Sequence, residues 1–507
     1  MRGLTSRLPS GPCQSTYWLQ GQAAAEARRP DHDRRGSVVS RAPQSDYVRE
    51  RKTLRALALA PVASTDELVG NLARIYTDVH ERDLGRYPSA EFQHAAPEIM
   101  TEMFLMRAAL HDRIGEWQAQ GLMSREAQHA LRDTLRVLRY ASDMMGEVHA
   151  QFASGDDSDP VQRAFSEVSY NTFVHPRFDT GTNLDFRSGD VLLVRGTKHN
   201  SAAIARIGDV DSQFSHVAIV HVDENGRSHL VESLIESGAG IQPLQAALAH
   251  RMARAVLFRH RDPEVAARAS RLIYEHVRRA NETGGRPILY DFTMKLAGAE
   301  RMFCSKLVRI AYLDASDGKV KLPAFTTRFN ATNRDFYRRI GVKAEESFAP
   351  GDVEIEPAFD LVAEWQDYRY TAQVRHQDLI MTKLFEWMEM HGYRFEEDFG
   401  VRLIALIGRF STRLSRTAQD LVASLFARIP PHMPRRTIAT IVMLHKTAQP
   451  LLEDLQHQER LKIATEGRPL HPREVFDHLE QARRRGLGRL GYLVAPRKSR
   501  RAAAKRA

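Results

Sequence analysis

Apolar residues are spaced in two different ways along the chain. Residues 51–160 and 375–482 repeat them at helical intervals, and Ser64 with Glu67 forms the pattern of a capping box, which marks a helix start. Between these regions, the segment 183–370 carries short apolar runs separated by turn residues. We therefore expect a mixed α and β centre flanked by two all-α regions.

The central segment is expected to combine a sheet with well-capped helices. The apolar runs predict four strands, at Val191–Val194, Phe214–Val222, Ser228–Leu234 and Val256–Phe258. Asp262 before Pro263 supplies a cap and a proline at the first helical position, so a helix is expected to follow. The segment 183–370 therefore has the pattern of one domain of mixed secondary structure.

The charge of the chain is concentrated at its C-terminus. Lys and Arg number 73 against 63 Asp and Glu, and ten of them lie in Arg483–Ala507, where no acid occurs. Such a tail can bind the phosphates of nucleic acid or of an anionic membrane. The candidates for these contacts are Arg483, Arg484, Arg485, Arg497, Lys498, Arg500 and Arg501. The interpretation that we favour is a solvated, disordered basic tail over 483–507.

The N-terminal end shows no periodic apolar pattern. Residues 1–50 are rich in Arg, Ser, Gly and Pro, so we expect a disordered leader. The leader lacks the apolar stretch of a secretory signal, and no apolar run in the chain is long enough to span a membrane. We therefore expect a cytoplasmic protein, with export as an effector as the alternative.

Cysteine content and motif spacing limit the metal and nucleotide chemistry. The two cysteines, Cys13 in the leader and Cys304 in the centre, exclude a disulfide framework and a cysteine-rich zinc site. No HExxH pattern occurs. Gly486–Gly491 matches GxGxxG in letters but follows three arginines rather than a strand, so it does not indicate a nucleotide site. No metal and no organic cofactor is expected.

Cys304 is the candidate nucleophile of the central segment. Four residues follow it at helical spacing on one face: Leu307, Val308, Ala311 and Tyr312. A helix that begins near Cys304 places the thiol at a helix N-terminus, where the dipole and free N–H groups stabilise a thiolate. The alternative is that Cys304 is a small core residue, as many buried cysteines are.

His216 begins an apolar strand, and the turn that follows this strand decides which residue faces it. The segment Asp223–Gly226 suits a type I turn with a left-handed glycine in a bulge. In that register Ala218 faces Glu232, and His216 comes within diagonal reach of the carboxylate. A two-residue Asn-Gly turn would put Glu232 on the opposite face. We predict the bulged turn, with Glu232 orienting His216 as the base for Cys304.

Further candidates for the substrate or oxyanion site are Tyr290, Asp291, Ser215 and Ser305. Tyr290 could line the site or donate to an oxyanion, and Asp291 could equally be a structural cap. The backbone N–H of Cys304 is a further oxyanion donor if the helix begins there.

Taken in order, several motifs resemble the YiiX/YebB-like branch of the NlpC/P60 superfamily. They are GDVLLVRG (Gly189–Gly196), SHVAIV (Ser215–Val220), VES (Val231–Ser233), YDF (Tyr290–Phe292), FCSKLVRIAY (Phe303–Tyr312) and PGDVEIEPAFDLVAEW (Pro350–Trp365). This branch contains circularly permuted papain-like enzymes, in which histidine precedes cysteine. The resemblance implies Cys304 as nucleophile, His216 as base and Glu232 as third residue. It also implies an α+β fold with a small antiparallel sheet and the cysteine on a packed helix.

The resemblance implies a thiol hydrolase that cleaves an amide or ester bond through an acyl-cysteine. The expected substrate is a peptide, an N-acyl amino acid or a lipid, and an amidase is favoured over a lipid acyltransferase or phospholipase. An arginine-flanked apolar stripe at 402–416 suits a membrane surface or, more commonly, packing on a neighbouring helix. The sequence is also compatible with a non-catalytic binding module that keeps the fold, with an injected toxin and with a nucleic-acid-binding protein.

Overall fold

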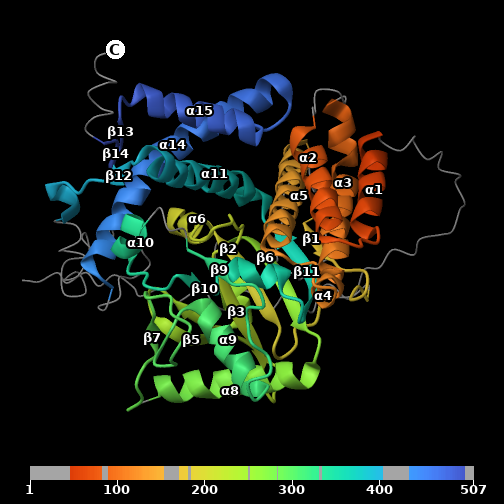
Figure 1. The fold of residues 1–507 in the computed structure, drawn as a ribbon, viewed down its shortest axis with the longest axis vertical. Coiled ribbons are helices and arrows are strands. Elements are labelled where there is room, and N and C mark those ends of the chain that lie inside the picture. The colour runs from red at the N-terminus through yellow and green to blue at the C-terminus, as the bar shows by residue number, and fades with distance from the viewer. Residues whose placement is uncertain are drawn as a thin grey trace, which may run out of the picture. The chain divides into compact units, whose positions relative to one another are not determined.

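The computed structural model describes residues 46–82, 89–152, 171–180, 184–248, 252–282, 284–329, 334–402 and 433–496 (Figure 1). Cys13, the apolar stripe that follows Arg402 and the basic residues beyond Pro496 lie outside these residues.

An antiparallel sheet forms the centre of the described chain, in the strand order β1-β11-β6-β2-β3-β4-β5. Its strands are β1 (Thr172–Val174), β2 (Val191–Gly196), β3 (His216–Val222), β4 (Ser228–Leu234), β5 (Gly238–Pro243), β6 (Met252–His260) and β11 (Phe359–Gln366). The four strands that the apolar runs predict are β2, β3, β4 and β6, and the α+β class is confirmed. The strand β5 escaped prediction because its two glycines and its proline lower the strand propensity of the segment.

Helices precede, interrupt and follow the sheet. They are α1 (Asp46–Leu59), α2 (Thr65–Glu81), α3 (Ser89–Asp112), α4 (Ile114–Ala119), α5 (Arg125–Phe152), α6 (His199–Ile204), α7 (Leu244–Leu248), α8 (Pro263–Asn281), α9 (Cys304–Ala315), α10 (Arg334–Ile340), α11 (Tyr368–His391), α14 (Arg435–Glu466) and α15 (Pro472–Arg485). The start of α1 at Asp46 corrects the predicted leader, because this helix begins within residues 1–50. None of the helices in the described ranges is long and apolar enough to cross a membrane.

Two predicted helix starts are confirmed by their caps. The hydroxyl of Ser64 accepts the N–H of Glu67 at 3.2 Å at the start of α2. The carboxylate of Asp262 accepts two N–H groups of the first turn of α8, and Pro263 occupies the first turn. Because these caps replace hydrogen bonds that the helix cannot make with itself, they fix where each helix begins.

Alternate residues of the central strands pack into different apolar layers. Val191 and Leu193 of β2 contribute to a core shared with α8 and α9, whereas Leu192 contributes to a core on the other face. Figure 1 shows α8 and α9 alongside the sheet, where α9 packs on β3 and α8 on β5. Gly189 has a φ of 93°, and a Cβ there would meet the carbonyl oxygen of Ala266 at 2.4 Å. Glycine at this position therefore allows α8 to approach the chain before β2.

Buried ion pairs tie the flanking helices to the sheet. Glu364 of β11 pairs with Arg107 of α3 at 3.1 Å and with Arg139 of α5 at 2.9 Å, and none of the three side chains is more than 2% exposed. Asp378 of α11 pairs with Arg195 of β2 at 2.6 Å, and both are fully buried. Because water is excluded, each charge depends on its partner for stabilisation.

By their internal contacts, the described residues from Asp46 onwards fall in one compact unit. The predicted boundary at residue 375 falls inside α11, and β1 extends the sheet to a segment before the predicted limit at 183. Short strands pair outside the main sheet: β7 (Leu289–Tyr290) with β8 (Arg301–Met302), and β9 (Thr327–Arg328) with β10 (Glu346–Ser347). The division of the chain into separate domains stays a prediction.

The C-terminal region corrects the prediction of a disordered tail from residue 483. The helix α15 continues to Arg485, and β14 (Leu493–Val494) pairs with β12 (Arg394–Phe395) and β13 (Arg489–Leu490). Leu493 and Val494 are buried, so a short apolar stretch within the basic sequence anchors it. Gly488 and Gly491 of the GxGxxG match have φ values of 87° and 55° and serve as turn residues near these strands.

Substituting Glu364 should destabilise the fold far more than substituting another acid of the same strand. Glu364→Gln leaves the buried Arg107 without an ion-pair partner and leaves Arg139 with Glu354 alone, at a cost of about 3–5 kcal/mol in the free energy of unfolding. Asp360→Asn removes ion pairs with the more exposed Arg261 and Arg177 and should cost less than about 1 kcal/mol. Urea unfolding at neutral pH measures both values.

The same pair of variants tests how the stability of the fold depends on pH. Burial raises the pKa of Glu364, but Arg107 and Arg139 outweigh burial and lower this pKa to about 2. Its stabilising contribution is therefore complete above the ordinary carboxyl pKa of 4.5 and is lost as the pH falls towards 2. The difference in the free energy of unfolding between wild type and Glu364→Gln should therefore become smaller over that pH range. Equal losses of stability in Glu364→Gln and Asp360→Asn at neutral pH would contradict the ion-pair interpretation.

Candidate active site

Cys304 is the first residue of α9. Phe303 before it is extended, with φ −97° and ψ 168°, and no side chain caps the helix. The apolar residues that follow on one face are buried, as predicted: Leu307, Val308, Ala311 and Tyr312. The thiol, on a residue only 5% exposed, therefore lies at the positive end of a helix that is anchored in the core.

The hairpin between β3 and β4 has the predicted bulged turn. The N–H of Asp223 donates to the carbonyl of Arg227 at 3.0 Å, that of Gly226 donates to the carbonyl of Asp223 at 2.9 Å, and Gly226 has a φ of 74°. Ile219 consequently lies opposite Val231, which is the register expected from this turn. The prediction that distinguished this turn from the two-residue turn is confirmed.

The register brings His216 to Glu232. Nε2 of His216 lies 2.5 Å from Oε2 of Glu232. The imidazole also makes a hydrogen bond with the thiol of Cys304. Because Nε2 faces the carboxylate, Nδ1 is the nitrogen left for the sulfur. Cys304, His216 and Glu232 therefore form a continuous chain of polar contacts, as the sequence predicts.

The main chain of β3 completes the surroundings of the sulfur. The paired stretch of β3 and β4 runs from the turn to Ile219 and Val231, and His216 lies beyond it. The backbone N–H of Val217, also beyond that stretch, donates to the sulfur of Cys304. The start of α9 thus meets the sheet where the two strands separate, and His216 and Val217 of β3 reach the thiol.

The thiol and the imidazole shift each other's protonation. Burial raises the pKa of Cys304, but the hydrogen bond and charge of His216, with the Val217 N–H and the Ser305 hydroxyl, outweigh it and lower that pKa. Burial lowers the pKa of His216, whereas its contacts with Cys304 and Glu232 raise it to about 10. Both shifts favour a thiolate beside an imidazolium, which is the reactive form of such a pair.

Two positioning contacts were not predicted from the sequence. The side-chain amide of Gln242, on β5, donates to Oε1 of Glu232, so the carboxylate is held on both oxygens. The hydroxyl of Ser233 donates to the carbonyl of Met302 at 2.7 Å and holds the chain just before Cys304. No signal marked Gln242, because it lies on the strand that the pattern did not reveal, whereas Ser233 stood unremarked within the VES motif.

The four further candidates are placed differently. Oγ of Ser305 lies 3.8 Å from the sulfur of Cys304, and Tyr290 is near enough for the thiolate to raise its pKa, which burial raises more strongly. Asp291 instead pairs with the buried Lys306 at 3.0 Å and caps the following turn. Ser215 accepts the N–H of Gly196 at 3.3 Å. The contacts of Asp291 and Ser215 are thus structural and do not include the sulfur.

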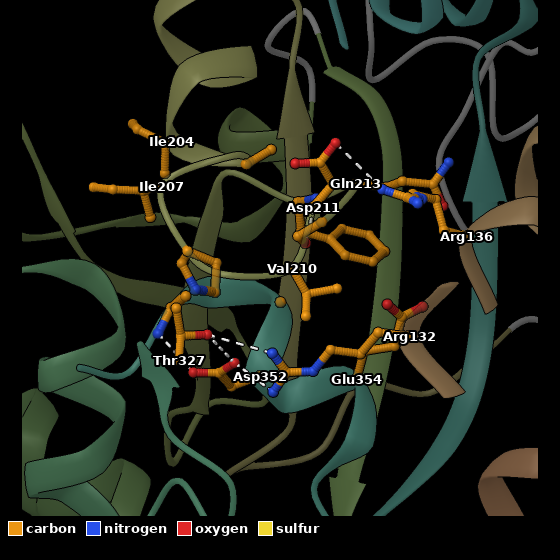
Figure 2. A pocket seen from close by; sticks show the side chains of 17 residues that line it. Arg132, Arg136, Ile204, Ile207, Val210, Asp211, Gln213, Thr327, Asp352 and Glu354 are labelled. Atoms are coloured by element: carbon orange, nitrogen blue, oxygen red, sulfur yellow. Dashed lines mark hydrogen bonds and ion pairs between the residues drawn. The ribbon is translucent and has the colours of Figure 1, made fainter. Parts of the chain in front are cut away.

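Another pocket lies between α5, the residues after α6 and the 3-10 helix Pro350–Ile355 (Figure 2). Arg132 pairs there with Asp352 at 2.7 Å, and Arg136 pairs with Asp211 at 3.3 Å. Figure 2 shows these arginines and acids directed at one another across the pocket. Because its charges are already paired and Cys304 does not line it, this pocket is not part of the candidate active site.

In a comparison with known proteins, the central segment matches the model of one family. Residues 185–363 match the sequence model of a family described as permuted papain-like amidase enzyme, YaeF/YiiX, C92 family. The match contains Cys304, His216 and Glu232, and the resemblance inferred from the motifs is confirmed. No curated protein and no solved structure was found to match. The helices α1–α5, α11, α14 and α15 lie outside the matched residues.

Removing His216 should raise the pKa of the Cys304 thiol above that of an ordinary thiol. His216→Ala deletes the main stabiliser of the thiolate and leaves burial, so alkylation by iodoacetamide at neutral pH should slow at least about tenfold. The pH at half-maximal alkylation should rise accordingly. A Cys13→Ser background leaves Cys304 as the one thiol of the chain.

His221→Ala is the matched control for this experiment. His221 lies on the same strand but bonds to Ser270 at 3.1 Å, so its loss should leave the alkylation midpoint unchanged. Glu232→Gln should shift the midpoint in the same direction as His216→Ala, but by less. If His216→Ala and His221→Ala have the same midpoint as wild type, the imidazole does not activate Cys304.

Proposed function

We propose that this chain is a thiol hydrolase that cleaves an amide or ester through an acyl-cysteine, and the match of residues 185–363 to the permuted papain-like amidase family supports this. The observation that supports this most directly is the contact of Cys304 with His216 at the start of α9. Glu232 lies on the other side of the imidazole. A nucleophile, a base and a group that orients the base are the parts that acyl transfer requires.

The first half of the reaction forms the acyl-cysteine. The thiolate of Cys304 attacks the substrate carbonyl, a carbon–sulfur bond forms, and the π electrons move to the oxygen. When the oxyanion collapses, the bond to the leaving nitrogen or oxygen breaks, and the imidazolium of His216 gives that atom its proton. The products are a thioester, a free amine or alcohol, and a neutral imidazole.

The second half hydrolyses the thioester. Neutral His216 takes a proton from water while the water oxygen attacks the acyl carbon. Collapse of this second oxyanion breaks the carbon–sulfur bond and releases the carboxylic acid. The thiolate of Cys304 and the imidazolium of His216 are restored, so no other co-reactant is needed. Throughout, the carboxylate of Glu232 stabilises the charged imidazole and holds its orientation.

Two donors are available for the oxyanion. The backbone N–H of Cys304 lies in the first turn of α9, where no carbonyl of the helix can accept it. The hydroxyl of Tyr290 has no hydrogen-bond partner among the described residues, and Tyr290 interacts electrostatically with Cys304. Its raised pKa keeps this phenol protonated at neutral pH, as a donor must be. We assign Tyr290 as the side-chain oxyanion donor.

Acyl transfer to an alcohol or amine is the second candidate function. It shares the first half-reaction and differs only in the acceptor of the acyl group. The apolar surroundings of Tyr290, which join Phe303 to residues of α14, favour it because they can exclude water. A non-catalytic binding module is not favoured, since it would not require a cysteine, a histidine and a glutamate in mutual contact. Binding of an anionic membrane or nucleic acid through Arg483–Arg485 stays a prediction.

Tyr290→Phe should slow turnover without altering the nucleophile. With p-nitrophenyl butyrate as substrate, we expect kcat to fall by about 10²–10³-fold, the range for loss of one oxyanion donor. The pH profile of Cys304 alkylation should stay unchanged, because the tyrosine is not a source of thiolate stabilisation. Cys304→Ala should abolish both turnover and the initial burst of nitrophenolate.

Tyr274→Phe provides the control for a lost phenol. Tyr274 stacks on His221, with ring centroids 4.2 Å apart, and its substitution should leave kcat unchanged. Intact mass measurement of the rapidly quenched wild type should detect one butyryl group on Cys304. Turnover that persists in Cys304→Ala would refute the acyl-cysteine mechanism, and an equal kcat in Tyr290→Phe and Tyr274→Phe would refute only the oxyanion role.

A further inference from the structure

A small polar pocket lies between α6, α11 and α14. In Figure 1, α6 lies beside α11, and contacts join both helices to α14. The volume of the pocket is about 130 Å³. Most of its lining side chains carry an amide or an imidazole, and those that matter are His199, Gln373, Gln377, His445 and Gln449. Neither Cys304 nor its polar partners are among the described lining residues, so this pocket is separate from the candidate active site.

His199 brings to this pocket an imidazole nitrogen that makes no hydrogen bond. Its Nε2 lies 3.0 Å from Oε1 of Gln449, whose Nε2 in turn donates to the carboxylate of Glu453 at 2.9 Å. The amide of Gln449 therefore accepts from His199, so Nε2 of the imidazole carries the proton and Nδ1 keeps a lone pair. Nδ1 is buried without a partner among the described residues, on a side chain that is only 4% exposed. A buried acceptor of this kind indicates a bound group.

Two further side chains bring lone pairs to the same pocket. His445 precedes Gln449 by one turn of α14, and its ring centroid lies 5.2 Å from that of His199. The His445 ring makes no hydrogen bond with another described residue. Nε2 of Gln377 donates to the carbonyl of Thr197 at 2.9 Å, which leaves Oε1 buried and without a partner within the described chain. The pocket thus gathers two imidazoles and an amide oxygen.

This set of donors suits a transition-metal ion better than it suits a hard cation. Imidazole nitrogen binds Zn²⁺ at about 2.0–2.1 Å, and two rings at the separation of His199 and His445 can reach one ion. A histidine that binds a metal usually donates its other N–H to an acceptor that fixes the ring. His199 makes this contact with Gln449, which Glu453 holds in turn. Mg²⁺ and Ca²⁺ prefer oxygen ligands, so they are not expected here.

We propose that this pocket binds a divalent transition-metal ion such as Zn²⁺ through Nδ1 of His199, the imidazole of His445 and Oε1 of Gln377, with water as a further ligand. No three His, Cys, Asp or Glu side chains gather for a metal anywhere in the described ranges, so the amide oxygen and water are needed to complete the coordination. The proposal goes beyond the hydrolase function and does not depend on it.

Such an ion would link two parts of the chain. His199 lies within the residues 185–363 that match the family, whereas His445 and Gln377 lie on helices outside them. An ion that binds only the folded protein stabilises it, so the site would hold α6 against α11 and α14.

Equilibrium dialysis of the full chain, without an affinity tag, tests the proposal by counting the Zn²⁺ ions bound per chain. A Cys13→Ser, Cys304→Ala background removes both thiols of the chain, because thiolates bind zinc themselves. At equal free Zn²⁺, His445→Ala should bind one ion fewer than this background. His457→Ala removes an exposed histidine of the same helix and should bind as many ions as the background.

The melting temperature gives a second readout of the same variants. Zn²⁺ should raise it in the background and in His457→Ala more than in His445→Ala, because the lost ion no longer stabilises the folded state. Mg²⁺ at the same concentration should not distinguish the three proteins.

Electron paramagnetic resonance with one equivalent of Cu²⁺ identifies the ligands directly. The background should show coupling to two imidazole nitrogens, and His445→Ala should show coupling to one. Equal zinc counts in His445→Ala and His457→Ala would overturn the proposal, and water would then be the partner of these lone pairs. A copper spectrum of the background without two imidazole couplings would overturn it as well, and this result does not depend on the folding of any histidine variant.

Discussion

The pairing of Glu364 with Arg107 and Arg139 is the contact on which the arrangement of the sheet depends. Taking such ions out of water costs several kcal/mol each, so the three side chains must stay together to remain buried. The compensation is incomplete, because the terminal nitrogens of Arg107 have no hydrogen-bond partner among the described residues and burial lowers its pKa. The network therefore fixes the position of β11 against α3 and α5, and through β6 and β2 the position of β3.

That position matters because the site is assembled where β3 and β4 separate. A fully paired hairpin would use the N–H of Val217 in the sheet, whereas here it donates to the sulfur of Cys304. The same separation leaves His216 free to contact both the thiol and Glu232. The sulfur thus accepts the N–H that would otherwise pair in the sheet. The helix dipole of α9 adds to the stabilisation of its negative charge. The geometry of the candidate site therefore depends on the interruption of this strand pair.

The sequence was sufficient for the parts that local rules determine. The cap of α8, the buried face of α9 and the bulged turn each follow from a few neighbouring residues, and the turn fixed the contact of His216 with Glu232. Gln242 could not be found in this way, because its strand lacks an apolar pattern and its partner is set by β4–β5 pairing. The ordered structure of residues 483–496 was not predicted for a related reason. The high average charge of this segment indicates disorder and conceals its short buried stretch.

The C-terminal helices have a physical reason to be part of the same unit as the central domain. Glu459 of α14 pairs with Arg375 of α11 at 3.1 Å, and Arg375 also pairs with Glu147 of α5 at 2.6 Å. These ion pairs hold α14 against α11 and α5, and Leu444 of α14 belongs to the same buried apolar cluster as Tyr290 and Phe303. A central domain alone would leave that side of Tyr290 open to water, and water would weaken the electrostatic interactions around Cys304. The flanking helices therefore cover one side of the candidate site with apolar side chains and lower the local dielectric there.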